Sequence, residues 1–148
     1  MRAHETTTDG IASAPNAGAL FDAYARETGV ERIGGANPNL GMYRAMEKAG
    51  VSRLFSVDDD DGRLVGICVL IVAEHPHYSE LVATIDTIYC LPEARSRGAG
   101  ARLMIAAKRK AQELGARIVL ISARDGSELH RQLEFSRSAT PVQHIYEI

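Results

Sequence analysis

The sequence lacks a long apolar run, and this absence sets the first limit on what the protein does. The longest such run, around residues 65–73, has the length of a strand, whereas a helix that crosses a bilayer requires about 20 apolar residues. Residues 1–16 contain no apolar core of the kind that a secretory signal carries. We therefore expect a cytoplasmic protein with no membrane partner.

Cysteine is scarce, and neither sign of charge is in clear excess. Cys68 and Cys90 stand alone within predicted strands, so we expect reduced, buried thiols. The 17 basic residues nearly balance the 19 acidic ones, and the net charge is −2. A protein dedicated to nucleic acid would carry a basic patch, so this balance argues against nucleic acid as the partner.

The length of 148 residues fits a single domain. Residues 1–15 are polar and show no sustained period, so they are either a flexible tail or a poorly marked first strand. The domain is predicted to span residues 16–148. Its first element is a helix over residues 17–28, with Asn16 as the capping residue.

A second helix is marked at both of its ends. Asn37 is a capping residue type, Pro38 is suited to the first helical position, and Gly50 closes the helix. The spacing i, i+3, i+4, i+7 within it predicts an apolar stripe formed by Met42, Ala45, Met46 and Ala49.

After Gly50 the pattern changes to strands. Two strands flank the acidic Asp-Gly turn at residues 58–62, which is typical of a hairpin. A solvated turn explains its four aspartates better than a metal site, because no further ligand cluster lies nearby in the sequence. The predicted strands span residues 54–57, 64–73, 81–91, 117–123 and 142–148; a long helix ends at Gly115 and a short one spans 126–134. This order predicts one mixed α/β sheet with helices on its faces.

The loop between the third strand and the long helix carries a chemical signal. Gly98 and Gly100 stand where the helix begins, so backbone N–H groups there can approach an anion that the helix dipole also favours. Arg95 and Arg97 add charged donors. A diphosphate is the natural ligand. The dinucleotide fingerprint is incomplete, and no Gly-Lys-Ser/Thr follows, so two other phosphate-binding motifs are excluded.

The pattern Arg95-x-x-Gly98-x-Gly100, after a strand that ends Tyr-Cys-Leu-Pro and before a helix, resembles the coenzyme A signature of the GNAT N-acetyltransferase superfamily. The resemblance covers about residues 54–135. The spacing of the elements also resembles that of short members carried by phages and prophages. It implies a mixed, mostly antiparallel central sheet with helices on both faces and a split at the coenzyme-binding strand. It also implies acetyl transfer from acetyl-CoA directly to an amine.

The resemblance assigns residues to the coenzyme. Its pyrophosphate is expected at the loop, on Arg95, Arg97, Gly98, Ala99, Gly100 and Ala101. The end of the preceding strand is expected to serve the pantetheine and the acyl carbonyl, which implicates Ile88, Tyr89 and Cys90. No metal is expected. The alternative is a catalytically silent coenzyme A-binding module of the same fold, in a regulatory or interaction role.

Asp86 is the predicted base. Under period-two alternation it shares a strand face with Ile88 and Cys90. The resemblance adds that many members carry a catalytic glutamate at this place. The alternative is a carboxylate that pairs with a basic side chain or lies at the wet end of the sheet.

The predicted acid is less well marked. The run from Leu129 to Phe135 resembles the family's Leu-Tyr-x-x-x-Gly-Phe, with His130 at the tyrosine position and Glu134 in place of glycine. A histidine titrates near neutrality and could protonate a thiolate. An exposed helical histidine is the alternative, and Tyr89 and Tyr146 are weaker candidates for the acid.

The turn with His75, His77 and Tyr78 either lines the acceptor groove or is a solvated loop; its spacing does not suit a zinc site. The acceptor stays open between a small-molecule amine, a protein amine and a nucleobase amine. The sequence is compatible with a monomer or a homodimer.

Overall fold

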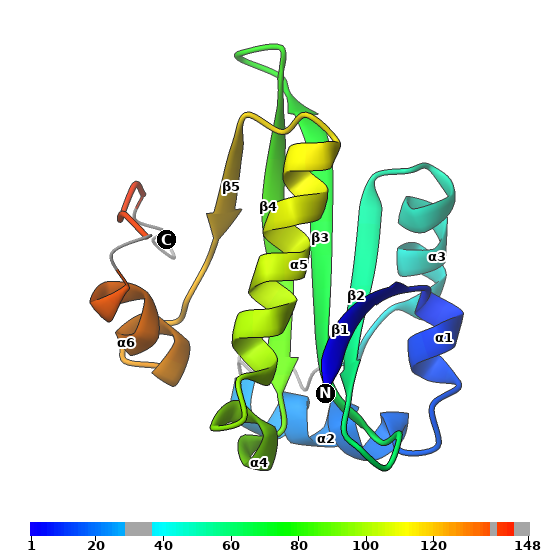
Figure 1. Cartoon of the computed structure of the whole chain (residues 1–148). Helices are drawn as coiled ribbons and strands as arrows, with labels where there is room; N and C mark the ends of the chain where they lie inside the picture. The colour runs from blue at the N-terminus through cyan, green and yellow to red at the C-terminus, as the bar shows by residue number, and fades with distance from the viewer. Residues whose placement is uncertain (29–36, 137–138, 144–148) are drawn as a thin grey trace.

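The structure is a computed structural model that describes residues 1–28, 37–136 and 139–143 (Figure 1). Its strands are β1 (Arg2–Thr6), β2 (Ser52–Asp58), β3 (Leu64–His75), β4 (Glu80–Cys90) and β5 (Ile118–Ile121). Its helices are α1 (Thr8–Ala12), α2 (Ala17–Thr28), α3 (Leu40–Lys48), α4 (Pro92–Arg95), α5 (Ala99–Glu113) and α6 (Glu128–Phe135). Within these residues, no helix is both long and apolar enough to cross a membrane.

The strands form one sheet in the order β1-β2-β3-β4-β5. Neighbours are antiparallel from β1 to β4, and β5 runs parallel to β4. The central strand β3 is apolar on both faces, and its first seven residues are buried. This arrangement confirms the expected mixed, mostly antiparallel sheet.

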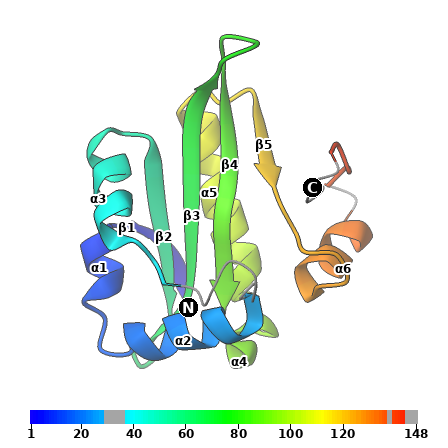
Figure 2. The same ribbon diagram turned by 180° about the vertical axis from the view of Figure 1, so that it is seen from behind.

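Helices cover both faces of the sheet: α5 lies on one face, and α1, α2 and α3 lie on the other (Figures 1 and 2). The helical period correctly predicts the inward side of α5, where Leu103, Ala107 and Ala111 are fully buried. Gly66 of β3 allows this helix to approach, because a Cβ there would lie 3.1 Å from Leu103 Cδ1. Gly66 therefore marks the face of the sheet that is turned toward α5.

The N-terminal residues 2–12 pack with the rest of the sheet. β1 pairs with β2 along its whole length. Helix α1, which the sequence pattern does not predict, is capped by Thr7, whose side chain accepts from the Gly10 N–H. Both the N–H and the hydroxyl of Thr8 donate to the Glu47 carboxylate of α3, so α1 and α3 are joined by hydrogen bonds.

One predicted helix cap is wrong, and the side chain of the other has a different partner than expected. α3 begins later than expected, because Asn39 rather than Asn37 accepts from the free N–H of Met42. Asn16 precedes α2 as predicted, but its side-chain amide both donates to and accepts from the backbone of Leu64. It therefore ties the start of α2 to the start of β3.

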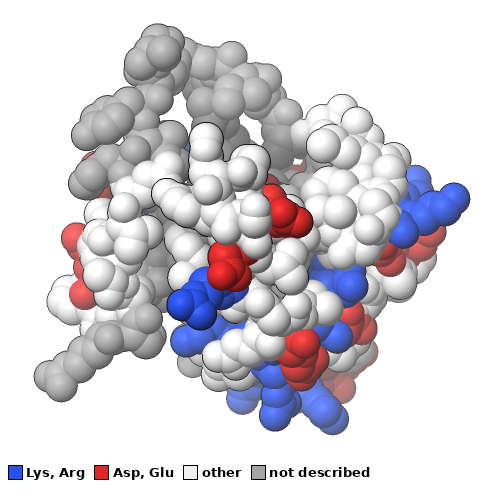
Figure 3. Space-filling view, turned by 90° about the horizontal axis from the view of Figure 1, so that it is seen from above, with Lys and Arg blue, Asp and Glu red and all other residues white. Residues whose placement is uncertain are grey.

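The predicted apolar stripe of α3 is not buried. Met42 is 61% exposed, and no residue of α3 is fully buried. Polar contacts hold this helix instead: Glu47 binds α1, Arg44 forms an ion pair with Asp9, and Tyr43 reaches the sheet. Acidic and basic side chains also lie close to one another on the face of the molecule seen in Figure 3. Spacing alone identifies an apolar face, but here hydrogen bonds from neighbouring elements determine which side packs.

A bulge interrupts β4 at Asp86. Val69 of β3 faces Thr87, and the next residue, Leu70, faces Ile85, so Asp86 has no partner across the ladder. On its other side β4 pairs with β5 only as far as Ile85. Within the described residues the two strands diverge from this point, which gives the expected split in the sheet.

The C-terminal part packs loosely. The residues of β5 are half-buried or exposed, and Ile118 is 50% exposed. No residue of α6 is fully buried. The predicted strand over residues 142–148 is not seen at Val142 or Gln143, and residues 144–148, with Tyr146, lie outside the described residues.

Candidate functional site

The loop that joins β4 to α5 is built around a left-handed glycine. The short helix α4 ends at Arg95, and Gly98 adopts φ 78° and ψ 24° at the N-cap position of α5. A side chain at Gly98 would be strained by this left-handed backbone conformation. Its Cβ would also lie 2.8 Å from Nη1 of Arg102, so the flexible guanidinium would have to move. A glycine cap has no side-chain acceptor, so the first N–H groups of α5 are left for another partner.

Gly100 follows in the first turn of α5, and its conformation is helical. A Cβ at this position would meet only Cys90 Sγ, at 3.9 Å, which is an ordinary van der Waals contact. The fold itself therefore does not require glycine here. A ligand that approaches the backbone closely from outside would require it, as a pyrophosphate does at a glycine-rich helix start.

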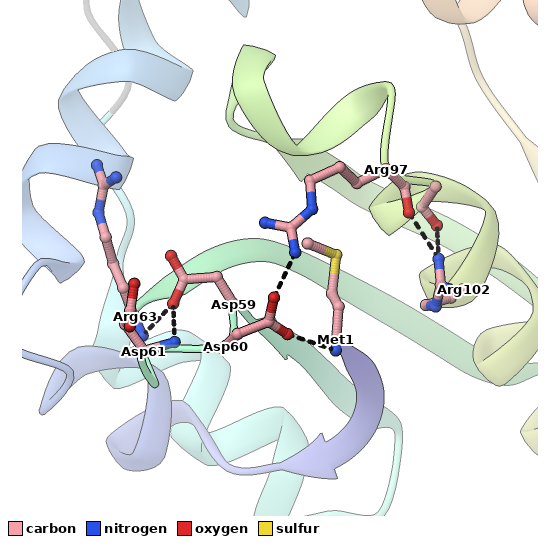
Figure 4. A network of polar contacts seen from close by, with 8 residues as sticks. Met1, Asp59, Asp60, Asp61, Arg63, Arg97 and Arg102 are labelled. Carbon is pink, nitrogen blue, oxygen red and sulfur yellow. Dashed lines mark hydrogen bonds and ion pairs between the residues drawn. The ribbon is translucent and has the colours of Figure 1, made fainter.

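Arg97 and Arg102 flank this helix start. Arg97 Nη2 lies 2.5 Å from Asp60 Oδ2, in the turn between β2 and β3, and Asp60 also accepts from the Met1 amino group at 3.2 Å (Figure 4). Arg102 Nη1 donates to the carbonyl oxygens of Arg97 and Gly98, at 2.8 and 3.1 Å. Arg102 thus fixes the loop, whereas the Arg97 side chain projects from it.

Arg95 is enclosed by other parts of the chain. Its guanidinium pairs with Glu27 of α2 at 2.5 Å and with Glu128 of α6 at 2.9 Å. Its Nε donates to the Cys90 carbonyl, and its Cζ lies 5.5 Å from the centre of the Tyr89 ring. The hydrogen bond that Arg95 donates to the Glu27 carboxylate is the main reason that the pKa of Arg95 is raised. This residue joins α2, β4 and α6.

The end of β4 presents alternate side chains to opposite faces. Cys90 pairs with Gly66 and is turned toward α5, as is Ile88 two residues earlier. Tyr89 faces the other way and meets Tyr24 of α2 edge-on, with ring centres 5.5 Å apart. Beyond the split the outer backbone edge of these residues has no strand partner within the described residues.

Asp86 lies at the bulge and is exposed. Its Oδ2 accepts from the Tyr43 hydroxyl at 3.4 Å and from the Thr87 hydroxyl at 3.2 Å. Tyr43 belongs to α3, so the Asp86 side chain is turned to the α1–α3 face. The prediction that it shares a face with Ile88 and Cys90 is wrong, because the extra residue of the bulge resets the alternation.

Tyr43 is a residue that the sequence did not single out. Burial, followed by the nearby Asp86 carboxylate, raises the pKa of Tyr43, so its hydroxyl remains a donor at neutral pH. Beside Tyr43 and Thr87, mostly apolar side chains of α2, α3 and the sheet line a cavity of about 50 Å³. The bulge therefore brings a carboxylate, two hydroxyls and an apolar pocket together at the split.

Comparisons with known proteins agree with this geometry. The sequence profile described as the Acetyltransferase (GNAT) family matches residues 19–135. The chain belongs to the GNAT acetyltransferase family. A search of curated proteins finds no significant match.

Solved GNAT-like structures share the fold of this GNAT chain at low identity. The ribosomal-protein-alanine N-acetyltransferase of Brucella melitensis biovar Abortus 2308 has a TM-score of 0.71 and 16% identity, covering 100% of this chain and 98% of the other. The aminoglycoside acetyltransferase meta-AAC0020, from an uncultured soil metagenomic sample and in complex with sisomicin, has a TM-score of 0.71 and 18% identity over 99% and 95%. A mutant of the BH1408 protein of Bacillus halodurans has a TM-score of 0.77 and 15% identity over 100% and 98%.

His130 lies in α6 of this GNAT domain, and its side-chain polar partners among the described residues are not residues of the bulge. Its Nδ1 accepts from the Gly126 N–H at 3.0 Å and lies 3.3 Å from Asp125 Oδ1, while its Nε2 lies 3.6 Å from Glu134. An unprotonated Nδ1 accepts from Gly126 and a protonated Nδ1 donates to Asp125, so the two contacts require different protonation of this nitrogen. All three partners come from the segment around His130 itself.

The turn with His75, His77 and Tyr78 forms the tip of the β3–β4 hairpin. The three rings lie against one another at tilted or edge-on angles, with 4.8 Å between the centres of His75 and Tyr78. Glu80, which pairs with His75, lies five residues before Ile85, and this spacing puts the tip roughly 17 Å from the bulge. The structure does not bring this turn to Asp86. In the described part of the chain, no group of three His, Cys, Asp or Glu is placed to hold a metal ion.

Proposed function

We propose that this chain transfers an acetyl group from acetyl-CoA directly to an amine. One observation carries the proposal: the glycine-capped start of α5, with its free N–H groups, stands at the end of the strand where the sheet splits. The family match over residues 19–135 supports the same activity.

The residues present fit the pyrophosphate of the coenzyme. The N–H groups of Ala99, Gly100 and Ala101 would bind it, and Arg97 would add a charged donor. The open space that glycine leaves at position 100 supports this assignment. Arg95 would position the loop through the Cys90 carbonyl, since two carboxylates already compensate its charge.

Backbone and side-chain groups along β4 would orient the coenzyme and the amine. Backbone groups of residues 88–90, at the outer edge of the split, would bind the pantetheine and the acyl carbonyl. Asp86 would take the proton that the amine loses as its nitrogen bonds to the carbonyl carbon and the carbon–sulfur bond breaks. Tyr43 and Thr87 would hold the Asp86 carboxylate through its Oδ2. His130 is the candidate donor of a proton to the leaving thiolate.

The two cysteines support direct transfer without an acyl-enzyme. Burial raises the pKa of the Cys90 thiol to about 11 and that of Cys68 to about 12. A thiol with so high a pKa is almost entirely protonated at neutral pH, and the thiolate is the nucleophilic form. Neither cysteine is therefore suited to carry the acetyl group.

The acceptor is a small-molecule or protein amine. Structures of the same fold include an enzyme named for ribosomal-protein alanine and one named for aminoglycosides. Asp86, exposed beside an apolar pocket, supports an amine that is attached to a partly apolar body.

A catalytically silent coenzyme-binding module is the second candidate. It is favoured by α6, where no residue is fully buried and where, among the described residues, the side-chain polar partners of His130 come from its own segment. Calorimetry with acetyl-CoA, combined with thiol-release assays over a panel of amines, separates the candidates. Amine-dependent thiol release supports the transferase; binding without turnover supports the module; absence of binding contradicts both.

A further inference from the structure

The acidic turn between β2 and β3 lies against the loop proposed to bind the coenzyme (Figure 4). Asp59 fixes the turn, because its Oδ1 accepts from the N–H groups of Asp61 and Arg63. Arg63 then pairs with Glu93 of α4 at 3.3 Å, so the turn is attached to the loop segment itself. Asp60 is left pointing toward Arg97.

The pair between Asp60 and Arg97 is accessible to solvent. The Asp60 side chain is 68% exposed and that of Arg97 is 51% exposed. Asp60 contacts no cation of the loop other than Arg97 among the described residues; its second partner is the Met1 amino group. An exposed pair of this kind is weak and readily exchanged, because water solvates both groups when they separate.

Arg95 makes the opposite arrangement. Two carboxylates, a carbonyl and a ring surround it, and its side chain is only 24% exposed. Freeing it would require two ion pairs to break. Of these two loop arginines, Arg97 is therefore the one that can turn to an incoming phosphate at low cost.

We propose that Asp60 binds the Arg97 guanidinium before the coenzyme arrives and competes with the coenzyme's pyrophosphate for it. Asp60 is then a positioning residue that sets the affinity for the donor. Carboxylate and phosphate bind a guanidinium in the same geometry, so one replaces the other. Of the four aspartates of the turn, Asp60 is the one that has this role. The proposal rests on the proposed function, which supplies the pyrophosphate.

The experiment compares Asp60→Asn with Asp61→Asn by calorimetry with coenzyme A. Asp61 lies in the same turn, and among the described residues its side chain forms no hydrogen bond or ion pair. Its variant therefore removes one negative charge and leaves the ion pair between Asp60 and Arg97 in place. Asp60→Asn is expected to bind coenzyme A roughly two- to fivefold more tightly than Asp61→Asn. In the Arg97→Gln background the two variants are expected to bind equally.

Two further readouts separate positioning from a general structural effect. Pantetheine lacks the pyrophosphate, so its affinity should be the same in both variants. In the proposed reaction, KM for acetyl-CoA should fall in Asp60→Asn while kcat and KM for the amine stay unchanged. Melting curves verify that both variants are folded.

Each other outcome overturns the proposal. Equal affinities of Asp60→Asn and Asp61→Asn would mean that only the net charge of the turn matters. Weaker binding by Asp60→Asn would mean that Asp60 supports the phosphate site rather than competing with it. If the wild-type chain binds no coenzyme A, the proposed function fails first, and this result is distinct from equal binding by the two variants.

Discussion

The two ends of the segment of β4 that lies beyond the split, from Asp86 to Cys90, are built in different ways. At the loop end, the site consists of backbone N–H groups whose availability depends on Gly98 and Gly100. At the bulge end, the site consists of side chains: Asp86 of β4 and Tyr43 of α3, which are far apart in the sequence. The loop end is a local structure that sequence spacing describes. The bulge end exists only after the elements have packed.

This difference predicts a division of effects. Changes at the loop end should alter binding of the donor, and changes at the bulge end should alter turnover. Four substitutions test the division, in order of decreasing expected effect.

Asp86→Asn should reduce kcat/KM by roughly 100-fold or more, because the amide cannot accept the proton of the amine. Coenzyme A affinity should change little, because Asp86 lies at the bulge of β4 and the loop proposed to bind the coenzyme follows the other end of the strand. Steady-state kinetics and calorimetry measure the two effects. Asp22→Asn, an exposed change on α2, is the matched control and should leave both values unchanged. Retention of the full rate in Asp86→Asn would remove it as the base.

Gly100→Ala should weaken coenzyme A binding by about tenfold, since a methyl group would occupy the space that the pyrophosphate needs. Stability should stay level or rise by up to about 1 kcal/mol, because alanine favours the helix and meets only Cys90 at 3.9 Å. Calorimetry and thermal melts measure the two quantities. Gly18→Ala, at an open position of α2, should show the gain in stability alone. Equal binding by Gly100→Ala and wild type would contradict the proposed loop site.

Tyr43→Phe should lower kcat/KM by about two- to tenfold, the range expected for one hydrogen bond to Asp86. Burial raises the pKa of Tyr43 above its ordinary value, so its hydroxyl stays protonated and the effect should be constant between pH 6 and pH 9. Pre-steady-state rates over this range measure it. Tyr24→Phe changes a ring of the same pocket and should have no comparable effect. An effect that appears only at high pH would point to a titrating Tyr43 instead.

Cys90→Ala should leave kcat unchanged, because direct transfer uses no thiol nucleophile. Burial raises the pKa of Cys90 to about 11, so its alkylation by iodoacetamide should be slow at pH 8 and accelerate as the pH rises toward 11. Mass spectrometry follows the alkylation. Rapid labelling at pH 7, together with loss of turnover in Cys90→Ala, would indicate an acyl-enzyme.

Sequence reasoning reached the fold and the loop because both depend on local patterns. The strands β2, β3 and β4, the long helix with buried Leu103, and the glycine-rich helix start follow from period and spacing. The mostly antiparallel arrangement of the sheet was implied by the family resemblance. No local sequence pattern predicts the bulge at Asp86, because the register of β3 and β4 is set by pairing between the two strands. For the same reason the sequence missed Tyr43.

The ion pairs of the loop could not be predicted from the sequence either. Glu27, Asp60 and Glu128 come from three separate segments, and only the folded chain brings them to Arg95 and Arg97. A sequence identifies the arginines as donors for a phosphate but does not reveal the carboxylates that occupy them. That information determines which arginine is available.

The most direct test of the account is a nuclear magnetic resonance titration of the labelled chain with coenzyme A. The account predicts that the largest shifts of backbone amide signals occur at Ala99, Gly100 and Ala101, the N–H groups left free by the glycine cap. Binding that leaves these three signals unchanged, with shifts elsewhere in the chain, would contradict it.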